Sequence, residues 1–149
     1  MIEGHDYIGV GVGAVIFNDK GLLFLAKRGQ AARNERGTWE FPGGGVQFGE
    51  PLIEAIKREI QEEYGMQIEV KDILGVFDHI LLEEKQHWIS ITYIALHFTG
   101  EPRINEPNKC ESIGWFTLED LPQPLSKITQ LNLHTYLSDY LYKSDAAAG

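Results

Sequence analysis

Three glutamates lie close together in residues 44–66, next to a run of glycines. Glu59 and Glu63 are four residues apart and Glu62 lies between them, so a helix would bring all three carboxylates near one another. Like charges at this spacing repel by about 0.2–0.5 kcal/mol per pair in water, and no Lys or Arg follows within helical reach. A segment that keeps this repulsion is typical of a site for a strongly positive ligand, and a divalent cation is the simplest candidate.

The apolar residues of the same segment predict which glutamate is buried. At about 100° per residue they define one helical face, made by Leu52, Ile53, Ile56, Ile60 and Tyr64. Glu63 falls inside this apolar arc, Glu59 lies at its border and Glu62 lies beyond it. A half-buried carboxylate without a partner is costly, and ligation of a metal removes that cost. Carboxylate oxygens suit Mg²⁺ or Mn²⁺ better than zinc.

The acidic helix and the glycine run each also have an ordinary structural explanation. An acidic helix that carries Lys57 and Arg58 is commonly a solvated surface, and three consecutive glycines, Gly43 to Gly45, can form a simple turn. The glycine run also lacks the Lys-Ser/Thr pair of a P-loop. The two features at a fixed spacing are more specific than either alone, so the combination favours a built site over a solvated face.

Strands and a second helix must hold the acidic helix in place. Short apolar runs bounded by turn residues predict strands at residues 10–17, 22–26, 38–41, 46–48, 68–70, 74–80, 87–98 and 113–117. Gly21 and residues 83–86 mark hairpin turns. The acidic helix is expected to hold Pro51 in its first turn and to end at Gly65, and helical spacing predicts a second helix within residues 125–140. This order predicts an α/β (α+β) fold with a mixed sheet between helices.

The composition predicts one ordinary globular domain. The chain has 149 residues, 43% of them hydrophobic and 23% charged, so we expect a single domain, 1–149, with a frayed tail at about 144–149. The net charge of −9 argues against binding of a nucleic-acid polymer. No apolar run reaches the roughly 20 residues of a membrane helix, and the N-terminus does not resemble a signal peptide. Cys110 is the sole cysteine. These features predict a soluble, cytoplasmic protein.

Residues 44–66 resemble the complete Nudix box, GX5EX7REUXEEXGU, in which U is an apolar residue. Every fixed position is matched, from Gly44 and Glu50 to Gly65 and Met66, which makes a chance agreement very improbable. Residues 39–43, WEFPG, are similar to the MutT-like members of that family. Further segments resemble a branch of nucleoside-triphosphate diphosphatases, at residues 9–13, 87–92, 109–112, 115 and 118–122.

The resemblance implies an α/β/α sandwich that hydrolyses a nucleoside diphosphate linked to another group, with Mg²⁺ or Mn²⁺ as cofactor. With a nucleoside triphosphate, canonical or oxidised, water attack on phosphorus would give the monophosphate and pyrophosphate. A pyrophosphatase for ADP-ribose, NADH or a dinucleoside polyphosphate is the alternative. A third possibility, a Nudix-fold ligand sensor without catalysis, is disfavoured because all the box glutamates are kept. The expected partner is a small nucleotide, with neither nucleic-acid polymer nor membrane, and family analogy favours a homodimer.

The resemblance also assigns roles within the box by position. Glu59 and Glu63 are expected to be the principal metal ligands, Glu62 to assist them, and the Gly43 carbonyl to add a ligand. One of the carboxylates can also take the proton of the attacking water. Arg58 and Glu50 are expected to form a supporting contact at the junction of loop and helix. The expected catalytic set is therefore Glu50, Arg58, Glu59, Glu62 and Glu63.

Four further residues are candidates for the site, three of them by the same resemblance and Trp88 by its aromatic side chain. Glu111 is expected to be an extra metal ligand or base, with an ordinary loop acid as the alternative. Arg28 is expected to contact the substrate together with Gly44, although Arg28 is also explained as a solvated residue at a strand end. Trp88 is one of three aromatic residues that can stack on a base or pack in the core.

Overall fold

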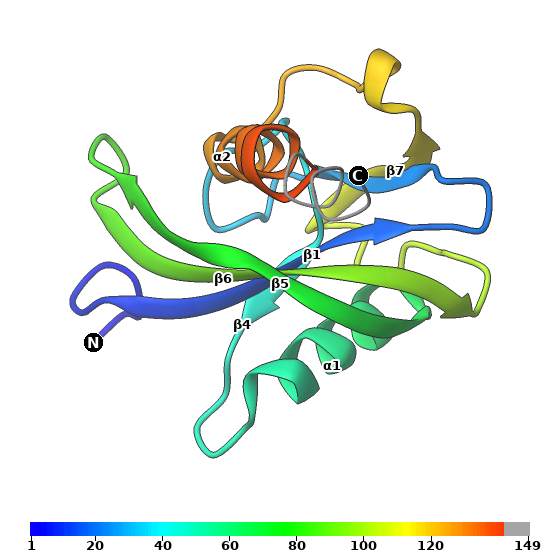
Figure 1. Cartoon of the computed structure of the whole chain (residues 1–149). Helices are drawn as coiled ribbons and strands as arrows, with labels where there is room; N and C mark the ends of the chain where they lie inside the picture. The colour runs from blue at the N-terminus through cyan, green and yellow to red at the C-terminus, as the bar shows by residue number, and fades with distance from the viewer. Residues whose placement is uncertain (142–149) are drawn as a thin grey trace.

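The computed structural model describes residues 1–141 and forms three layers, with a mixed sheet between two helices (Figure 1). The strands are β1 (Gly9–Phe17), β2 (Leu23–Arg28), β3 (Trp39–Glu40), β4 (Gly43–Gly45), β5 (Gln67–Leu81), β6 (Gln86–Thr99) and β7 (Cys110–Phe116). The helices are α1 (Leu52–Tyr64) and α2 (Lys127–Thr135), and α2 continues into a π-helical turn, Tyr136–Tyr140. The predicted α/β/α sandwich is confirmed. The predicted frayed tail lies outside the described residues.

β1 lies at the centre of the sheet and changes neighbours along its length. It runs parallel to β6 throughout. On its other edge it pairs antiparallel with β4, and only its last residue, Phe17, pairs with β2. β2 in turn pairs with β3 and β7. The sheet therefore splits next to β1. Residues at this split form part of the wall of the cavity described below.

Two strand predictions were wrong. The glycine run itself forms β4, whereas residues 46–48 form no strand. Glycine is required there because a Cβ on Gly43 would lie 2.1 Å from the carbonyl oxygen of Val12 on the paired strand. β5 is one strand where two were expected, because bulges between residues 70 and 75 bend it without ending its pairing with β6.

Each helix covers one face of the sheet (Figure 1). The face under α1 holds one apolar cluster and the face under α2 holds another. β6 contributes to both, with Ile91 and Tyr93 on the α1 side and Ile94 on the α2 side, as its alternating sequence predicted. No helix within residues 1–141 has the length and apolarity needed to cross a membrane.

The buried face of α1 differs from the predicted one. The residues of α1 that are buried are Ala55, Ile56, Ile60 and Tyr64. Ile53 is 42% exposed and Leu52 is 36% exposed, so the prediction that these two residues belong to the buried face was wrong, because the sheet does not cover the first turn. The helix begins one residue after Pro51 and ends at Gly65, whose left-handed φ of 68° confirms the predicted cap. The corrected face has Glu63 near its centre.

A chain of buried hydrogen bonds fixes α2 to the segment that precedes β4. Ser126 caps the helix by accepting a hydrogen bond from the Thr129 backbone N–H, and its hydroxyl donates to Thr129 Oγ1 at 2.8 Å. Thr129 Oγ1 accepts from the Phe41 N–H at 3.1 Å. Further along, Asn132 Oδ1 accepts from the buried Thr92 hydroxyl of β6. These contacts set the position of α2 over the sheet.

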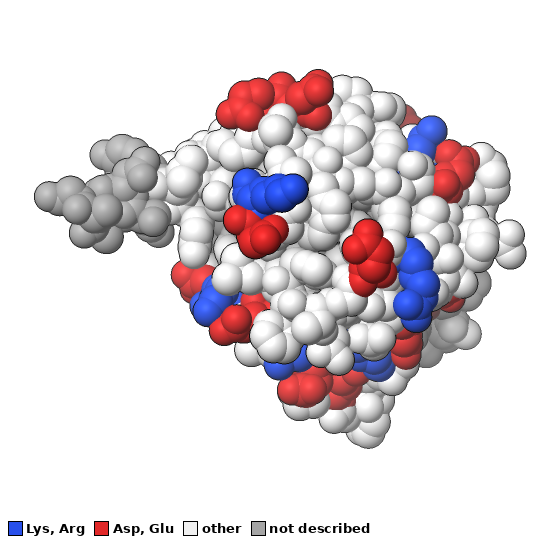
Figure 2. Space-filling model, turned by 90° about the vertical axis from the view of Figure 1, so that its right-hand side faces the viewer, with Lys and Arg blue, Asp and Glu red and all other residues white. Residues whose placement is uncertain are grey.

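Figure 2 shows one face of the molecule, on which acidic and basic side chains are interspersed with uncharged surface. The basic groups on that face are separated from one another rather than joined in a stripe.

The cap of α2 gives a test of this arrangement. Ser126→Ala should lower the free energy of unfolding by about 1–2 kcal/mol, because the buried Thr129 N–H loses its acceptor. Urea denaturation measures the change. The matched control is Ser138→Ala, at an exposed position of the π-helical turn, which should change stability by less than about 0.5 kcal/mol. Equal effects of the two substitutions would contradict the role of Ser126.

Candidate active site

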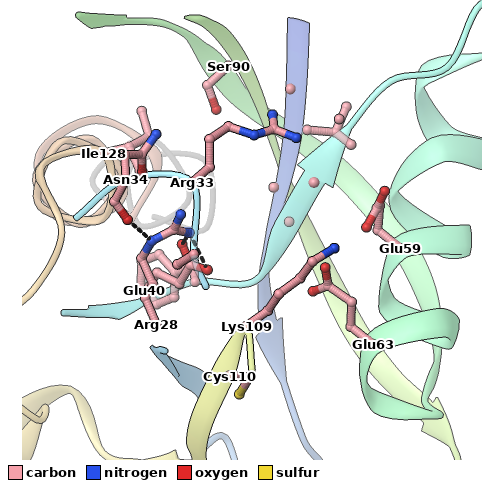
Figure 3. A pocket seen from close by; sticks show the side chains of 18 of the residues that line it. Arg28, Arg33, Asn34, Glu40, Glu59, Glu63, Ser90, Lys109, Cys110 and Ile128 are labelled. Carbon is pink, nitrogen blue, oxygen red and sulfur yellow. Dashed lines mark hydrogen bonds and ion pairs between the residues drawn. The ribbon is translucent and has the colours of Figure 1, made fainter. Parts of the chain in front are cut away.

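A cavity of about 510 Å³ opens where the sheet divides (Figure 3). Its floor is largely backbone, supplied by Gly11, Gly13 and Gly43–Gly45 on the paired strands β1 and β4. The small face of β1 that the sequence shows as alternating glycines is this floor. Side chains reach over it from α1 on one side and from the loop after β2 on the other.

Glu59 and Glu63 extend from α1 into the cavity (Figure 3). Burial raises the pKa of Glu63 to about 8, and the Glu59 carboxylate adds to that shift. Burial also raises the pKa of Glu59, against the opposing effect of Arg58. Glu63 forms no ion pair with any Lys, Arg or His side chain of residues 1–141. Two adjacent carboxylates with raised pKa values form a site that a cation would stabilise.

Gly44 is packed directly against the Glu59 side chain. A Cβ at residue 44 would lie 2.2 Å from Glu59 Cδ and 2.3 Å from one of its carboxylate oxygens. The glycine of the box therefore allows the carboxylate to lie flat on β4. Gly43 is placed on the same strand, but the close approach of its Cβ position is to the backbone of Val12 instead.

Arg58 organises the edge of the site. Its guanidinium donates two hydrogen bonds to Glu50, at 2.6 and 2.9 Å, and one to the Gly45 carbonyl at 3.1 Å. It also donates to Glu59 at 3.0 Å and to Glu62 at 3.2 Å. Hydrogen bonding to Arg58 lowers the pKa of Glu50 and, in return, raises the pKa of Arg58. The contact between Arg58 and Glu50 that the resemblance implied is present, and it joins the start of α1 to β4.

Glu62 is separated from the other two glutamates. Its side chain is 57% exposed, pairs with Arg58 and lies outside the cavity lining. No Lys or Arg follows the glutamates within helical reach, but Arg58 precedes Glu62 by four residues and pairs with it. Partly for this reason, no three His, Cys, Asp or Glu side chains of the described chain gather as ligands around one point.

Arg28 lies inside the cavity but is already paired. It donates to both carboxylate oxygens of Glu40, at 2.9 and 2.7 Å, and to the Asn34 carbonyl at 2.7 Å. Both side chains are 17% exposed. Although burial opposes it, the Glu40 carboxylate raises the pKa of Arg28. Arg28 is therefore a half-buried, oriented residue, and the alternative of a solvated strand-end arginine was wrong.

Glu111 does not lie in the cavity. It pairs with Lys27 at 3.2 Å on the adjacent strand β2, because β7 turns its side chain away. Glu106 lines the cavity instead and contributes to the raised pKa of Glu63. The loop that carries Glu106 is tied to the end of α1, since Asn105 donates to the Glu63 carbonyl through its N–H and to the Glu62 carbonyl through its amide. Glu111 therefore lies outside the cavity in which it was expected, and Glu106 is the carboxylate of the segment before β7 that borders it.

Trp88 borders the cavity but does not offer a free ring face. Its side chain is 6% exposed, and the Arg33 guanidinium lies 4.5 Å from the ring centroid. Its indole N–H donates to Gln86 at 2.9 Å. Stacking of a base on Trp88 is therefore obstructed in this structure. Of the remaining lining residues, Cys110 is buried, and burial raises the pKa of its thiol to about 11.

Several cavity residues were missed by the sequence reasoning. They are Arg33, Asn34, Glu40, Glu106, Lys109, Ile128 and Asn132. Glu40 could have been found, because it lies within the WEFPG segment next to the box. Lys109 lies within residues 109–112, one of the segments that carried the resemblance, whereas the others belong to loops or to α2 and no signal in the sequence marks them.

The residues present fit a hard divalent cation. Glu59 and Glu63 provide carboxylate oxygens on one buried helix face, and their raised pKa values show that burial leaves their charge incompletely compensated. Oxygen donors of this kind are the ligands that Mg²⁺ and Mn²⁺ take in proteins, usually with waters and substrate phosphates. Two further carboxylates border the same cavity: Glu40, which is paired with Arg28, and Glu106.

Comparison with known proteins agrees with this site. The sequence model of the NUDIX domain matches residues 8–136. A MutT NUDIX hydrolase of Burkholderia pseudomallei has a solved structure that is 43% identical, with a TM-score of 0.80, over 87% of this chain and 98% of that one. Mouse 8-oxo-dGDP phosphatase NUDT18 is 31% identical over 80% of this chain, and the chain spans 36% of that protein's length. The ADP-ribose pyrophosphatase of Methanocaldococcus jannaschii is 32% identical over 76% of this chain and 64% of that protein.

A domain model that spans most of the chain, on a fold with the matching box helix, establishes that the protein belongs to the Nudix family. Within the family it is a MutT-like member, as the similarity to the Burkholderia hydrolase shows.

The pKa of Glu63 predicts a pH-dependent stability of the metal-free protein. Between the ordinary value of 4.5 and about 8, the folded state holds a proton that the unfolded chain has released, so the free energy of unfolding falls as pH rises through this window. Glu63→Gln should remove this fall and be more stable than the wild type by about 2–4 kcal/mol near pH 8.5, with a smaller gain near pH 6. Urea denaturation with a chelator present measures it. Glu62→Gln, at an exposed position on the same helix, should keep the wild-type dependence of the free energy of unfolding on pH. A Glu63→Gln variant with that same pH dependence would disprove the raised pKa of Glu63.

The packing of Gly44 predicts a selective effect on metal binding. Gly44→Ala should weaken Mn²⁺ binding by about tenfold or more, because the added methyl displaces the Glu59 carboxylate. Calorimetric titration with Mn²⁺ measures this. Gly45→Ala is the control, since its Cβ would meet only Glu3, at 3.6 Å. Similar Mn²⁺ affinities in the two variants would show that Glu59 does not hold the metal.

Proposed function

We propose that the protein hydrolyses a nucleoside triphosphate, canonical or oxidised, to the nucleoside monophosphate and pyrophosphate in the presence of Mg²⁺ or Mn²⁺. The observation that carries this proposal is the buried pair Glu59 and Glu63, which lies at the edge of a cavity of about 510 Å³. This volume falls within the roughly 300–1,000 Å³ of small-molecule sites. Family membership supports the reaction class.

The reaction needs negative charge neutralised on phosphate oxygens and a water held in line with the bond that breaks. A bound divalent cation would supply charge neutralisation and acidify a water. Glu59 and Glu63 would hold that cation, with the Gly43 carbonyl as a further ligand. Arg58 and Glu50 would hold α1 in a fixed position relative to β4, since Arg58 bridges Glu50, Glu59 and the Gly45 carbonyl.

The bond changes are simple. The water oxygen forms a bond to phosphorus, and the bridging P–O bond breaks, so the leaving pyrophosphate takes the electron pair of that bond. A carboxylate at the cavity edge accepts the proton of the water, and Glu106 joins Glu63 and Glu59 as a candidate for this role because it borders the same space. Glu62 is a weaker candidate, since it faces solvent and Arg58.

The other side of the cavity fits the nucleoside. Phe41 and Ile128 provide apolar surface there, and Asn132 provides an amide whose oxygen is already engaged by Thr92. The Arg28–Glu40 pair borders this region with oriented polar groups. We propose that the base lies among these residues and that Gly44 lets the phosphates approach the backbone.

The names of the relatives support a second substrate class. The Methanocaldococcus protein is named an ADP-ribose pyrophosphatase, and hydrolysis of ADP-ribose would use the same metal site on a diphosphate bridge. NADH and dinucleoside polyphosphates share that bridge. The mouse relative is named a phosphatase for an oxidised nucleoside diphosphate, so oxidised purine nucleotides belong in the same comparison. A non-catalytic ligand sensor is the least supported alternative.

Cellular role and assembly follow from the same proposal. Hydrolysis of altered nucleotides would serve clean-up of the nucleotide pool in the cytoplasm, with a small nucleotide as the only required partner. A homodimer is proposed from family analogy, and size-exclusion chromatography with light scattering tests it.

Glu63→Gln is expected to lower kcat/KM by about a hundredfold or more while the fold stays intact. The reason is that the substitution removes a charged ligand without changing the size of the side chain. Pyrophosphate release with Mg²⁺ measures turnover, and circular dichroism checks the fold. A folded variant that retains activity would refute the metal assignment.

A substrate panel decides between the two classes. We expect the highest kcat/KM for a nucleoside triphosphate among canonical triphosphates, oxidised purine nucleotides and ADP-ribose, all assayed with Mg²⁺. The panel measures both phosphate and pyrophosphate release, so that cleavage positions are distinguished. A clear preference for ADP-ribose would replace the first proposal with the second.

A further inference from the structure

Arg33 reaches over the cavity from the loop between β2 and β3 (Figure 3). Its guanidinium makes no ion pair with any carboxylate of residues 1–141, and no hydrogen bond from it to a described residue is present. The residue as a whole is exposed, so the charged group lies at the mouth of the cavity rather than deep within it. A cation that has no carboxylate partner among the described residues is suited to an anionic ligand.

Trp88 supplies the surface against which Arg33 packs. The guanidinium carbon lies 4.5 Å from the ring centroid, within the distance of a cation–π contact. The ring itself is fixed by the backbone of Gly4 and Gly9, because a Cβ at either position would come within 2.5 Å of indole atoms. Trp88 therefore acts as a fixed support for the arginine.

A second contact holds the backbone of Arg33. The Gln86 amide donates to the Arg33 carbonyl at 3.1 Å, and Gln86 Oε1 accepts from both Trp88 Nε1, at 2.9 Å, and the Asn34 amide, at 2.8 Å. Gln86 and Asn34 are both buried. The loop and the β6 strand are thereby locked together around Arg33. Such preorganisation reduces the entropy that ligand binding would otherwise remove.

The charges around the cavity leave Arg33 as the available cation among the described lining residues. Arg28 is neutralised by Glu40 at 2.7 Å. Lys109 pairs with Glu106 at 3.5 Å. Arg33 lines the same cavity, pairs with no carboxylate of residues 1–141 and lies over the ring of Trp88. An anion that enters the cavity would therefore meet Arg33 without displacing an existing ion pair.

We propose that Arg33, oriented by Trp88, binds the pyrophosphate part of the substrate, an inference that rests on the proposed triphosphate hydrolysis. A guanidinium matches two phosphate oxygens at once, and the pyrophosphate is the most highly charged part of a nucleoside triphosphate. The exposed mouth suits a hydrated, charged group, whereas the apolar Phe41 and Ile128 suit the base. Trp88 thus has a positioning role in place of base stacking.

Steady-state kinetics and product inhibition test the proposal. Arg33→Gln should raise KM for the triphosphate and the inhibition constant of pyrophosphate by about tenfold or more, with kcat changed less than about threefold. The inhibition constant of the nucleoside monophosphate should stay unchanged. Arg33→Lys should fall between the wild type and Arg33→Gln, because an ammonium keeps the charge but not the paired geometry.

Arg36→Gln is the matched control, because it removes the same charge from the same loop outside the cavity lining. Its KM and inhibition constants should equal those of the wild type. Equal effects of Arg33→Gln and Arg36→Gln would reduce the result to a general loss of positive charge and overturn the proposal. A selective loss of monophosphate inhibition in Arg33→Gln would overturn it as well.

Trp88 variants test the positioning role. Trp88→Leu should raise KM in the same direction as Arg33→Gln, and Trp88→Phe should restore most of the affinity because it keeps an aromatic face. Melting curves identify any variant that fails to fold, and in that case Trp88→Phe and the Arg33 pair still decide the outcome. A folded Trp88→Leu variant with wild-type KM would show that Arg33 does not depend on the ring.

Binding of magnesium pyrophosphate, measured by calorimetry without turnover, separates the two proposals. If the wild-type protein hydrolyses no triphosphate, the proposed function fails, whatever Arg33 does. If the wild type hydrolyses triphosphate but Arg33→Gln binds pyrophosphate as tightly as the wild type, the proposed function stands and this inference fails.

Discussion

The burial of two like-charged carboxylates, Glu59 and Glu63, is the constraint to which the neighbouring structure responds. Arg58 compensates Glu59 and also holds Glu50 and the Gly45 carbonyl, so the helix, its preceding loop and β4 form one unit. Glu63 receives no such compensation from a described cation, and burial raises its pKa to about 8. The protein thereby retains an electrostatic cost that a divalent cation would remove. The apolar residues Ala55, Ile56, Ile60 and Tyr64 hold the acidic helix against the sheet despite this cost.

The second constraint is the close approach of backbone around that pair. β4 consists of glycines because the position of Gly43 leaves no room beside Val12, and that of Gly44 leaves none beside Glu59. Since β4 occupies the edge of β1, β2 meets β1 only at Phe17. The sheet divides there, and the resulting cavity has a backbone floor. The same glycines therefore admit the carboxylate and create the space for a ligand.

The remaining parts of the site come from loops whose position depends on the whole fold. Glu106 reaches the cavity because Asn105 caps the end of α1, whereas Glu111 pairs with Lys27 on the far side of the strand. Arg33 reaches it because the Gln86 side chain and Trp88 hold its loop against β6. No short spacing in the sequence predicts either arrangement. Asn105 and Glu62 are 43 positions apart, Gln86 and Arg33 are 53 apart, and the direction of Glu111 depends on the orientation of its strand.

Local patterns determined the family, the two helices, most strands and the pair of glutamates on α1, because helical and strand periodicity act over a few residues. Helical periodicity placed Glu63 on the buried side, but it also placed Leu52 and Ile53 there, since only the fold shows which turn the sheet covers. Tertiary structure alone decided that Glu62 faces Arg58, that Glu106 replaces Glu111 in the cavity, and that Arg28 is paired with Glu40. The physical reason is that charge pairing and burial depend on which distant segments meet, and those contacts exist only once the chain has folded.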